Sequence, residues 1–521
     1  MAYLLHQLIA KGGEGQNDAL ALADKRVRLS YAELKKAVSD FAHGLLHIGL
    51  ARGDRVAIFL PKNVNNVIAM FGATAAGGTM VPVNPVLKAA QVQHILTDAG
   101  ATVFVTSNDR LKLMADALAD CEDLRTVIVT NDDAQPPEGA NYEVITWASL
   151  NTETTESHAT IDTDVAALMY TSGSTGRPKG VILSHRNMVA GAESVASYIG
   201  NHSQDRILCA LPLSFDAGFS QLSTAFCSGA AAILHDYFLP KDTLKVAETE
   251  AITGITAVPP LWMQLADLDW PQSVRERVRY FANTGGKMPR TLLGKLRQNF
   301  PHAKPFLMYG LTEAFRSTYL PPEEVDNRPD SIGKAIPNAE ILVVRPDGSL
   351  CDVDEPGELV HRGALVGLGY WRDPERTAIR YKPAPGQSAH IPTTELAVWS
   401  GDTVRRDKEG FLYFVGRKDD MIKTSGYRVS PTDLEESLYA SGFVTEAGAF
   451  GIEDETLGQR IVICAVAQTD IENVETQLQQ YCRRELPNYM MPSEFIWYDK
   501  LPRNPNGKID RATLSAELNA R

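Results

Sequence analysis

One eleven-residue segment limits what this chain can fold into and bind: Tyr170-Thr-Ser-Gly-Ser-Thr-Gly-Arg-Pro-Lys-Gly180. The apolar runs Val165–Met169 before it and Val181–Leu183 after it predict a strand on each side. Its three glycines (173, 176 and 180) allow the backbone to approach a ligand closely, its four hydroxyls offer hydrogen bonds, and Lys179 adds a positive charge. A flexible surface turn is the alternative, but a turn has no need of all these groups in one run. The segment therefore predicts a polyphosphate-binding loop. It differs from the common P-loop, which requires Ser or Thr where Gly180 follows the lysine.

Length, charge and cysteine content narrow the class of protein. A chain of 521 residues is too long to bury one core, so two or more domains are expected. The net charge of −13 argues against a nucleic-acid partner, because binding a phosphate backbone requires a basic face. The six cysteines include no C-x-x-C pair, which suggests neither a disulfide framework nor a zinc site and fits a reducing cytoplasm.

The N-terminal residues 2–10 are apolar, but they lack a basic lead and a cleavage site. They are predicted to form the first helix rather than a signal peptide. The chain contains no run of 18 or more apolar residues, so no membrane span is expected. These features together predict a cytoplasmic protein.

Short apolar runs alternate with helical patterns between residues 54 and 129, and again between 207 and 308. This alternation predicts an α/β fold with doubly wound parallel sheets. Residues 131–160 are polar and are expected to form an exposed connection. From about residue 339 to 415 the pattern changes to strands separated by turns, which predicts a β subregion within a large N-terminal domain, 1–415.

The charged run Gly416–Met421 predicts a hinge. The chain beyond it has strands and helices of its own, enough for a small α+β C-terminal domain, 416–521. In the large domain, three predicted strands end at Phe215-Asp216, Asn283–Gly286 and Tyr309–Glu313. Ligands gather beyond the carboxyl ends of strands in open α/β sheets, so these loops are expected to converge with the glycine-rich loop.

The segment Tyr170–Gly180 resembles the phosphate-binding signature of the adenylate-forming enzymes, which include acyl-CoA synthetases, adenylation domains of nonribosomal peptide synthetases and luciferases. Further motifs follow in that family's order: Tyr309–Glu313, Ser400–Asp402, Gly416-Arg417 and Asn504–Asp510. Because the motifs recur in order over some 340 residues, the resemblance covers the whole chain. It implies ATP and Mg²⁺ as cofactors.

The resemblance also implies roles for individual residues. Tyr309 would pack on adenine, Thr312 would contact phosphate, and Glu313 would hold Mg²⁺, a hard cation that prefers oxygen ligands. Asp402 and Arg417 would bind the ribose. The remaining nucleotide-binding residues would be Thr171, Ser172, Gly173, Ser174, Thr175, Gly176, Lys179, Gly285 and Gly286.

Lys508 is placed by the resemblance as the catalytic lysine, and a physical argument supports it. A carboxylate and the α-phosphate of ATP repel each other by on the order of 4 kcal/mol at about 4 Å and an effective dielectric constant near 20. A lysine that bridges their oxygens removes this repulsion and stabilises the transition state. By itself, a lysine near the C-terminus is expected only to be exposed.

The resemblance further implies a second half-reaction, in which the small domain rotates about Asp419 and presents another face. Lys423 is among the residues that would then act at the thiol, and Gly426 would line a pantetheine tunnel too narrow for a Cβ. The thiol would belong to CoA or to the phosphopantetheine of an acyl carrier protein. An adenylate-forming oxidase or a non-catalytic relative is the third hypothesis, but the complete set of Lys179, Glu313, Asp402 and Lys508 argues against lost activity.

The substrate acid is less constrained. Aryl- and fatty-acyl-CoA ligases usually carry Phe-His after the Leu-Pro-Leu strand, whereas this chain has Phe215-Asp216, as in amino-acid-activating domains. Asp216 would bind a substrate ammonium, or it would only cap the helix near Ala217. Arg316 would bind a second substrate carboxylate, or a neighbouring acid such as Glu323 or Glu324. The expected pocket comprises Phe215, Asp216, Ala217, Ser220, Ala257, Thr284, Arg316 and Ser317.

The segments Asp54–Pro85, Gly310–Asp330 and Gly363–Thr377 are most similar to AMP-forming acyl-CoA ligases of the exosortase A-associated type. Free-standing enzymes that load β-amino acids onto carrier proteins are also similar. We therefore expect ATP-dependent activation of an amino-bearing carboxylic acid and its transfer to a thiol. The alternative is an AMP-forming acyl-CoA ligase for a fatty or aryl acid without an amine.

Overall fold

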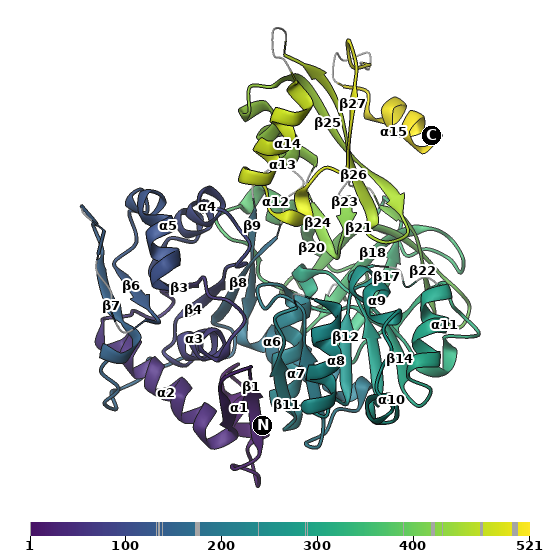
Figure 1. The fold of residues 1–521 in the computed structure, drawn as a ribbon. Helices are drawn as coiled ribbons and strands as arrows, with labels where there is room; N and C mark the ends of the chain where they lie inside the picture. The colour runs from purple at the N-terminus through teal and green to yellow at the C-terminus, as the bar shows by residue number, and fades with distance from the viewer. Residues whose placement is uncertain are drawn as a thin grey trace.

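The computed structural model describes residues 2–520, with the exception of 132, 134, 135, 138, 172–177, 238, 287, 289, 389, 418–421, 430, 469–472 and 503–508. Within this part of the chain, three β-sheets organise the molecule (Figure 1). Two belong to a large N-terminal domain and the third to a small C-terminal domain, as the sequence predicts.

The first sheet is mainly parallel and has helices on both faces. Its strand order is β19-β9-β8-β4-β3-β5-β6-β7. Strand β9 runs antiparallel to both of its neighbours, β8 and β19, and the other neighbouring strands are parallel. Helix α3 (Val64–Ala75) packs on one face, and α4 (Ala89–Ala99) and α5 (Asn108–Ala119) pack on the other. The strands are β3 (Arg55–Ile58), β4 (Thr79–Pro82), β5 (Ala101–Thr106), β6 (Thr126–Val129), β7 (Glu143–Thr146), β8 (Val165–Thr171), β9 (Lys179–Ser184) and β19 (Gly369–Tyr370).

The second sheet joins a parallel half to the β subregion. Its parallel strands are β1 (Leu20–Ala23), β11 (Ala231–Leu234), β10 (Arg206–Cys209), β12 (Gly254–Ala257), β13 (Tyr280–Asn283) and β14 (Lys304–Tyr309). Antiparallel strands continue it through β15 (Thr318–Leu320), β16 (Ser331–Ala335), β22 (Leu412–Arg417), β21 (Leu396–Arg406), β18 (Gly357–Gly363) and β17 (Ala339–Val344). The β subregion is therefore an extension of the α/β sheet.

Helices α6 (His185–Ile199) and α7 (Asp216–Ser228) fill the space between the two sheets together with α3. Ser184 begins α6 with a capping box, because its hydroxyl accepts from the Asn187 backbone N–H. The rings of Phe71 and Phe219 stack with centroids 5.6 Å apart and join α3 to α7. This shared core fixes the ends of β9 and β10 relative to each other.

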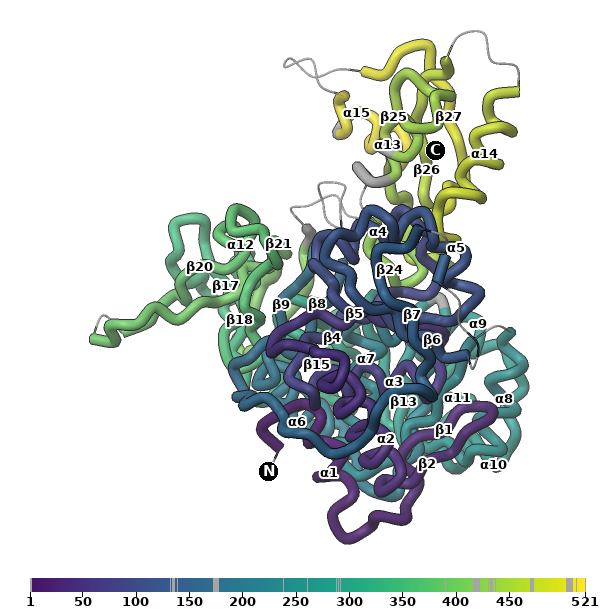
Figure 2. Tube along the Cα trace, turned by 90° about the vertical axis from the view of Figure 1, so that its left-hand side faces the viewer, coloured from purple at the N-terminus to yellow at the C-terminus, as the bar shows by residue number. Residues whose placement is uncertain are grey.

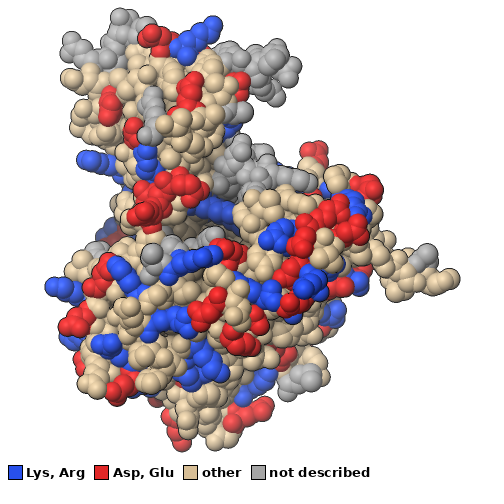
Figure 3. Space-filling view, turned by 90° about the vertical axis from the view of Figure 1, so that its right-hand side faces the viewer, with Lys and Arg blue, Asp and Glu red and all other residues tan. Residues whose placement is uncertain are grey.

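The small domain has a core of its own on both faces of its sheet. The strand order is β24-β23-β26-β25, and β27 pairs with β26. In Figures 1 and 2, β24 lies against the large domain and α15 lies toward the other end of the small domain. On the face drawn in Figure 3, the surface is hollowed between the two domains. The elements are β23 (Ile422–Thr424), β24 (Tyr427–Val429), α13 (Pro431–Ala440), β25 (Val444–Asp454), β26 (Gly458–Ala467), α14 (Val474–Glu485), β27 (Glu494–Trp497) and α15 (Arg511–Asn519).

Two local predictions need correction. The polar stretch 131–160 is not only a connection, because β7 lies within it and pairs with β6 at the edge of the first sheet. The β subregion also contains a helix, α12 (Pro374–Arg380), which Asp373 caps by accepting from the Arg376 N–H. None of the helices described is long and apolar enough to cross a membrane.

Candidate active site

The centre of the site is a buried cluster at the start of β9, the end of the glycine-rich loop. Lys179 Nζ lies 3.4 Å from Glu313 Oε1 and 2.8 Å from the Tyr370 hydroxyl, which in turn donates to Glu313 Oε1 over 2.6 Å. Glu313 belongs to the short 3-10 helix η2 (Thr312–Ala314), and Tyr370 to β19, which pairs with β9. Two of the segments predicted to converge, the end of the glycine-rich loop at Lys179 and the Tyr309–Glu313 loop, meet here, with Tyr370 as an additional member.

The charges of this cluster are fixed by their surroundings. Burial by itself would raise the pKa of Glu313, but the Lys179 and Arg380 charges and the Tyr370 hydrogen bond outweigh burial and lower that pKa to about 2. Burial lowers the pKa of Lys179, while Glu313 opposes the shift. Burial also raises the pKa of Tyr370, so its hydroxyl stays a donor to the ionised Glu313. The site thus holds the ionised carboxylate of Glu313 beside the positive charges of Lys179 and Arg380.

A second group of residues borders this cluster. The Tyr309 hydroxyl donates to Asp402 Oδ2, and Asp402 lies opposite Arg417 in the β21–β22 ladder. Three of the residues predicted to bind adenine and ribose are therefore neighbours. Gly285 follows β13 with a φ of +76°, a conformation that favours glycine, and a Cβ there would lie 3.1 Å from Val258 Cγ1.

The predicted acyl pocket contains a second pair of opposite charges. Arg316 Nη1 lies 3.3 Å from Asp216 Oδ2 and 3.4 Å from Thr284 Oγ1, and the Thr312 hydroxyl lies 3.3 Å from Asp216 Oδ1. Arg316 is 3% exposed, so the pair is largely removed from water. One alternative is wrong: the N-cap of α7 is Phe215, and Asp216 makes no capping bond. The other holds in kind, because Arg316 does pair with an acidic side chain of the protein, but that acid is Asp216 rather than Glu323 or Glu324.

A strained turn directs Arg316 into this position. Phe315 has a φ of +55°, which non-glycine residues rarely adopt, and its ring is fully buried. Gly191 of α6 leaves room for that ring, since a Cβ there would lie 2.4 Å from Phe315 Cδ1. Packing against α6 therefore holds the turn that places Arg316 opposite Asp216.

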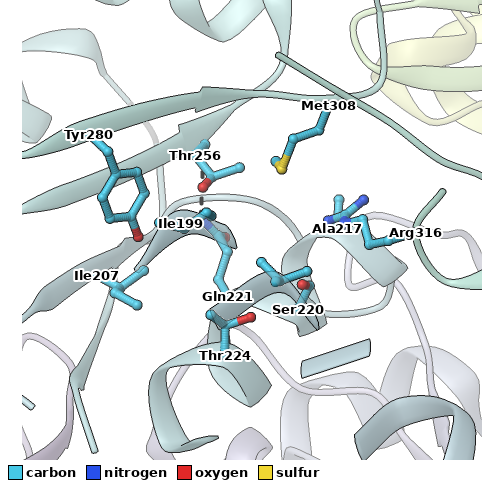
Figure 4. A pocket seen from close by; sticks show the side chains of 11 residues that line it. Ile199, Ile207, Ala217, Ser220, Gln221, Thr224, Thr256, Tyr280, Met308 and Arg316 are labelled. Atoms are coloured by element: carbon cyan, nitrogen blue, oxygen red, sulfur yellow. Dashed lines mark hydrogen bonds between the residues drawn. The ribbon is translucent and has the colours of Figure 1, made fainter. Parts of the chain in front are cut away.

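A small cavity of about 20 Å³, room for about one water molecule, lies beside this pair. Figure 4 shows the side chains of Arg316, Met308, Ser220 and Thr224 around it. Of the predicted pocket residues, Ala217, Ser220 and Arg316 line the cavity. Ser317 instead directs its hydroxyl to His361 Nδ1, 2.9 Å away. The other lining residues are Val195, Ile199, Ile207, Gln221, Thr256 and Tyr280.

The small domain approaches the site through the β23–β24 hairpin. Its turn residues Ser425 and Gly426 have φ angles of +52° and +80°, as in tight two-residue hairpins. A Cβ on Gly426 would lie 2.8 Å from Val258 Cγ2, and Tyr427 meets Phe215 edge-on with centroids 5.2 Å apart. Arg428 adds to the charges that lower the pKa of Glu313. Lys423 lies on β23, with Nζ 4.8 Å from the centre of the Phe414 ring.

Several predicted residues lie outside the described residues: Ser172, Gly173, Ser174, Thr175, Gly176, Asp419 and Lys508, and the side chain of Arg417. Gly180 is described. A Cβ there would lie 3.1 Å from the Tyr170 ring and 3.3 Å from Trp371 Cβ, so a glycine at this position also serves close packing between strands.

The sequence reasoning missed Tyr370, Arg380 and Tyr427. The Gly-Tyr-Trp run at 369–371, inside a stretch already noted for its similarity to acyl-CoA ligases, is the one signal that could have identified Tyr370. Mg²⁺ fits the donor set here. The described residues contain no group of three or more potential metal ligands, and Mg²⁺ is commonly held by one or two carboxylates together with substrate phosphates. Glu313, ionised and buried, offers such a carboxylate.

Comparisons with known proteins place these features in a family. Residues 9–371 match the model of the AMP-binding enzyme family, and residues 433–508 match the AMP-binding enzyme C-terminal domain. Tyrocidine synthase 1 of Brevibacillus parabrevis is 29% identical over 524 residues, and the match covers 98% of this chain but only 44% of that longer protein. L-proline--[L-prolyl-carrier protein] ligase of Pseudomonas fluorescens is 30% identical over 527 residues, with 99% of each protein covered. The chain thus spans less than half the length of the peptide synthases that it matches, but the whole length of the carrier-protein ligase.

Among solved structures, o-succinylbenzoate CoA synthetase of Bacillus subtilis is 27% identical. A double mutant of that enzyme with the product analogue OSB-NCoA gives a TM-score of 0.82, covering 99% of this chain and 98% of that one. The structure of the same enzyme with its acyl-adenylate intermediate gives a TM-score of 0.68, covering 98% of this chain and 97% of that one. Its structure with ATP and magnesium ion gives a TM-score of 0.67, covering 98% of this chain and 99% of that one. With two family models that together span most of its length, the chain belongs to the adenylate-forming family of AMP-binding enzymes.

Proposed function

We propose that this protein is an acid–thiol ligase that works in two steps. In the first, an oxygen of the substrate carboxylate attacks the α-phosphorus of ATP, an acyl-adenylate forms and pyrophosphate leaves. In the second, a thiol sulfur attacks the acyl carbonyl, a thioester forms and AMP leaves with the electron pair of the broken bond. The observation that carries the proposal is the buried Lys179–Tyr370–Glu313 cluster beside the glycine-rich loop.

The cluster supplies what the first step needs from the large domain. Lys179, at the end of the loop proposed to hold the phosphates, would stabilise negative charge that develops there. Glu313 would hold Mg²⁺, which supplies positive charge to the leaving pyrophosphate when bound. Tyr309 and Asp402, joined by a hydrogen bond, would hold adenine and ribose, with Arg417 beside them. Thr171, Ser172, Gly173, Ser174, Thr175, Gly176, Gly285 and Gly286 complete the proposed nucleotide site.

Lys508 is proposed to bring the two anionic reactants together from the small domain. The residues described after it belong to a face of the small domain different from that of the hairpin. Ile509, Leu514 and Leu518 pack with Phe450 in a cluster on the side of the small sheet that carries α15. The β23–β24 hairpin, in contrast, contacts the large domain. Presenting Lys508 to the site would therefore require a rotation, for which Asp419 is the proposed hinge and 415/416 the domain boundary.

The arrangement of the two domains supports the proposed second step. The structure of o-succinylbenzoate CoA synthetase with a CoA product analogue gives a TM-score of 0.82, whereas its structures with ATP or the acyl-adenylate give 0.67–0.68. The matched share of the chain is nearly the same in the three comparisons. Because the sequence identity is the same in each comparison, the difference reflects conformation. The docked hairpin carries Lys423 and has Gly426 next to Val258 and Gly285, which agrees with a thioester-forming state.

The proposed substrate is an amino-bearing carboxylic acid. Asp216 starts α7 at the edge of the acyl pocket and, with partners at 3.3 Å, has room to accept an ammonium. The similarity to a ligase named for L-proline supports an amino acid substrate. Because Arg316 already faces Asp216, the amine is not required to neutralise that carboxylate, and a fatty or aryl acid without an amine is the alternative.

Further details follow the same proposal. The acceptor is CoA or the phosphopantetheine of a carrier protein, in line with a CoA synthetase and a carrier-protein ligase among the relatives. We retain the likeness to exosortase A-associated ligases as the proposed subtype. None of the six cysteines, all of which are described, forms a disulfide, which supports a cytoplasmic location.

Pyrophosphate exchange over a panel of amino acids and their desamino analogues tests the proposal. Exchange that depends on the amine, followed by thioester formation when a thiol is added, is the expected result. Running the panel once with CoA and once with a phosphopantetheinylated carrier protein identifies the acceptor. Equal exchange with both kinds of acid would reject the amine, and no exchange with any acid would reject adenylation.

A further inference from the structure

We infer that the acid activated by this protein carries a second carboxylate in addition to its amine, and that Arg316 binds it. This inference rests on the proposed amine-bearing substrate and extends it to a class: amino dicarboxylic acids. The carboxylate to be activated would face the nucleotide, the ammonium would face Asp216, and the second carboxylate would bind the guanidinium of Arg316.

The first ground is that Arg316 has unused hydrogen-bonding capacity. A guanidinium has five N–H donors, and those of Arg316 make two long contacts, 3.3 Å to Asp216 and 3.4 Å to Thr284. Its Nε is buried without a hydrogen-bond partner among the described residues. An arginine–carboxylate pair that serves structure looks different in the same domain: Arg279 binds both oxygens of Asp205, over 2.6 Å and 3.0 Å. A buried donor left without a partner is costly, so the free capacity of Arg316 indicates a ligand.

The second ground is the cavity that Arg316 faces (Figure 4). Arg316 is the only charged residue among those found to line it, and the hydroxyl of Thr224, another lining residue, is also buried without a partner in the described part of the chain. The nearby Tyr198 offers no counter-ion, because burial raises its pKa and keeps its hydroxyl neutral. Arg316 and Thr224 thus leave one cation and one additional donor unpaired along this cavity.

Charge balance decides between substrate classes. A monocarboxylic amino acid would bring an ammonium to a pair that is already neutral and leave excess positive charge in a buried site. A dicarboxylic acid without an amine would leave excess negative charge. An amino dicarboxylic acid adds one charge of each sign, so Asp216 and Arg316 each gain an opposite charge, and the buried site stays neutral.

The test compares matched acids in pyrophosphate exchange by the full-length protein. The probes are racemic aspartate and glutamate, their amide isosteres asparagine and glutamine, and the desamino diacids succinate and glutarate. We expect kcat/KM for at least one amino diacid to exceed that of its amide isostere by about 30-fold or more, as for a buried charge pair that contributes at least 2 kcal/mol. In Arg316→Gln this ratio should fall to near one while the preference for an amine remains. Arg279→Gln, which breaks the structural pair, should keep the ratio.

The outcomes separate this inference from the proposed function. Equal use of the diacids and their amides by the unaltered protein would overturn the inference and leave amine recognition intact. Exchange with succinate or glutarate but not with aspartate or glutamate would support Arg316 as the carboxylate reader and reject the amine. The panel on the unaltered protein decides these points even if Arg316→Gln does not fold.

Discussion

The site contains two pairs of opposite charge that differ in how firmly the protein holds them. The Lys179–Glu313 pair is joined by Tyr370 through contacts of 2.6 Å and 2.8 Å, and the charge of Arg380 helps to keep Glu313 ionised, with a pKa of about 2. The Arg316–Asp216 pair is held by contacts of 3.3 Å and borders a cavity. The two pairs are similarly shielded, with side chains 15% and 9% exposed for Lys179 and Glu313 and 4% and 16% for Arg316 and Asp216, so exposure to water does not explain the difference.

The contrast follows the two roles that we propose for the site: the Lys179–Glu313 pair serves the chemistry on the phosphates, and the Arg316–Asp216 pair recognises the acid. Chemistry on the phosphates is the same for every acid, so the groups that perform it can be fixed in advance. Recognition of the acid has to leave donors and acceptors open for the substrate. Variants of the first pair should therefore affect all acids equally, whereas variants of the second should change which acid is used.

Glu313→Gln should have the largest effect, because it removes the proposed Mg²⁺ ligand and leaves Lys179 buried without its counter-charge. We expect pyrophosphate exchange to fall by about 10³-fold with every acid, the scale on which loss of one charge-stabilising group slows a reaction. Thermal unfolding, measured in parallel, separates misfolding from lost chemistry. Glu340→Gln, which breaks the exposed pair with Arg362, is the control and should leave the rate unchanged within about twofold. If the loss of pyrophosphate exchange in Glu313→Gln differed from one acid to another, the proposed difference in role between the two charge pairs would be contradicted.

The hairpin borders both pairs, since Arg428 affects Glu313 and Tyr427 contacts Phe215 next to Asp216. Gly426→Ala should impair its docking for two reasons. A φ of +80° strains any residue with a Cβ by about 1–2 kcal/mol, and the new Cβ would lie 2.8–3.0 Å from Val258 atoms. We expect transfer from the acyl-adenylate to the thiol to slow by about 10- to 100-fold, from the sum of strain and overlap.

Gly442→Ala is the matched control for this variant. Gly442 lies in the same domain with a φ of +72°, but a Cβ there meets no atom within 4 Å. Single-turnover thioester formation by this control should stay within about threefold of the unaltered protein, as expected for strain without overlap. If both variants slow the transfer equally, strain in the small domain is responsible and hairpin docking is not part of the second step.

The sequence allows the main architecture and the convergence of the loops to be predicted, because strand–helix alternation and residues at strand ends leave local signals. Strand β7 leaves no such signal, because its residues lie half-buried at a sheet edge and buried and exposed positions do not alternate along it. Tyr370 belongs to a two-residue strand, too short for a periodic pattern, that pairs with β9. It contacts Lys179, which lies 191 positions away in the chain. Long-range pairing of this kind is visible only once the chain has folded.

The Arg316–Asp216 pair could not be predicted for a different reason. Both residues were identified as pocket residues, but their pairing depends on the left-handed turn at Phe315, and that turn depends on the space left by Gly191 on α6. Phenylalanine carries no local preference for that conformation. The pairing of Asp216 with Arg316 therefore depends on the packing of two distant segments, which local sequence does not reveal.

Tyr370→Phe should have the smallest effect, and it tests whether the first pair is firmly held because of a single hydrogen bond. A hydrogen bond to a charged group contributes about 1.5–3 kcal/mol, so we expect adenylation at pH 8 to fall by about tenfold, at the lower end of that range. The bond is also one of the causes that lower the pKa of Glu313. Its loss should raise that pKa, because burial, the largest influence, acts in that direction.

The sign of the shift gives this variant a pH signature. In the unaltered protein Glu313, with a pKa of about 2, stays ionised throughout the working range, so its protonation does not limit the rate. In Tyr370→Phe the acid limb should move to higher pH, and the deficit should be larger at pH 5.5 than at pH 8. Tyr381→Phe is the control, because its ring packs edge-on against Tyr370, 5.7 Å away, whereas Glu313 accepts from Tyr370. A deficit that does not change with pH, or one that Tyr381→Phe reproduces, would mean that the ring of Tyr370 rather than its hydroxyl positions the pair.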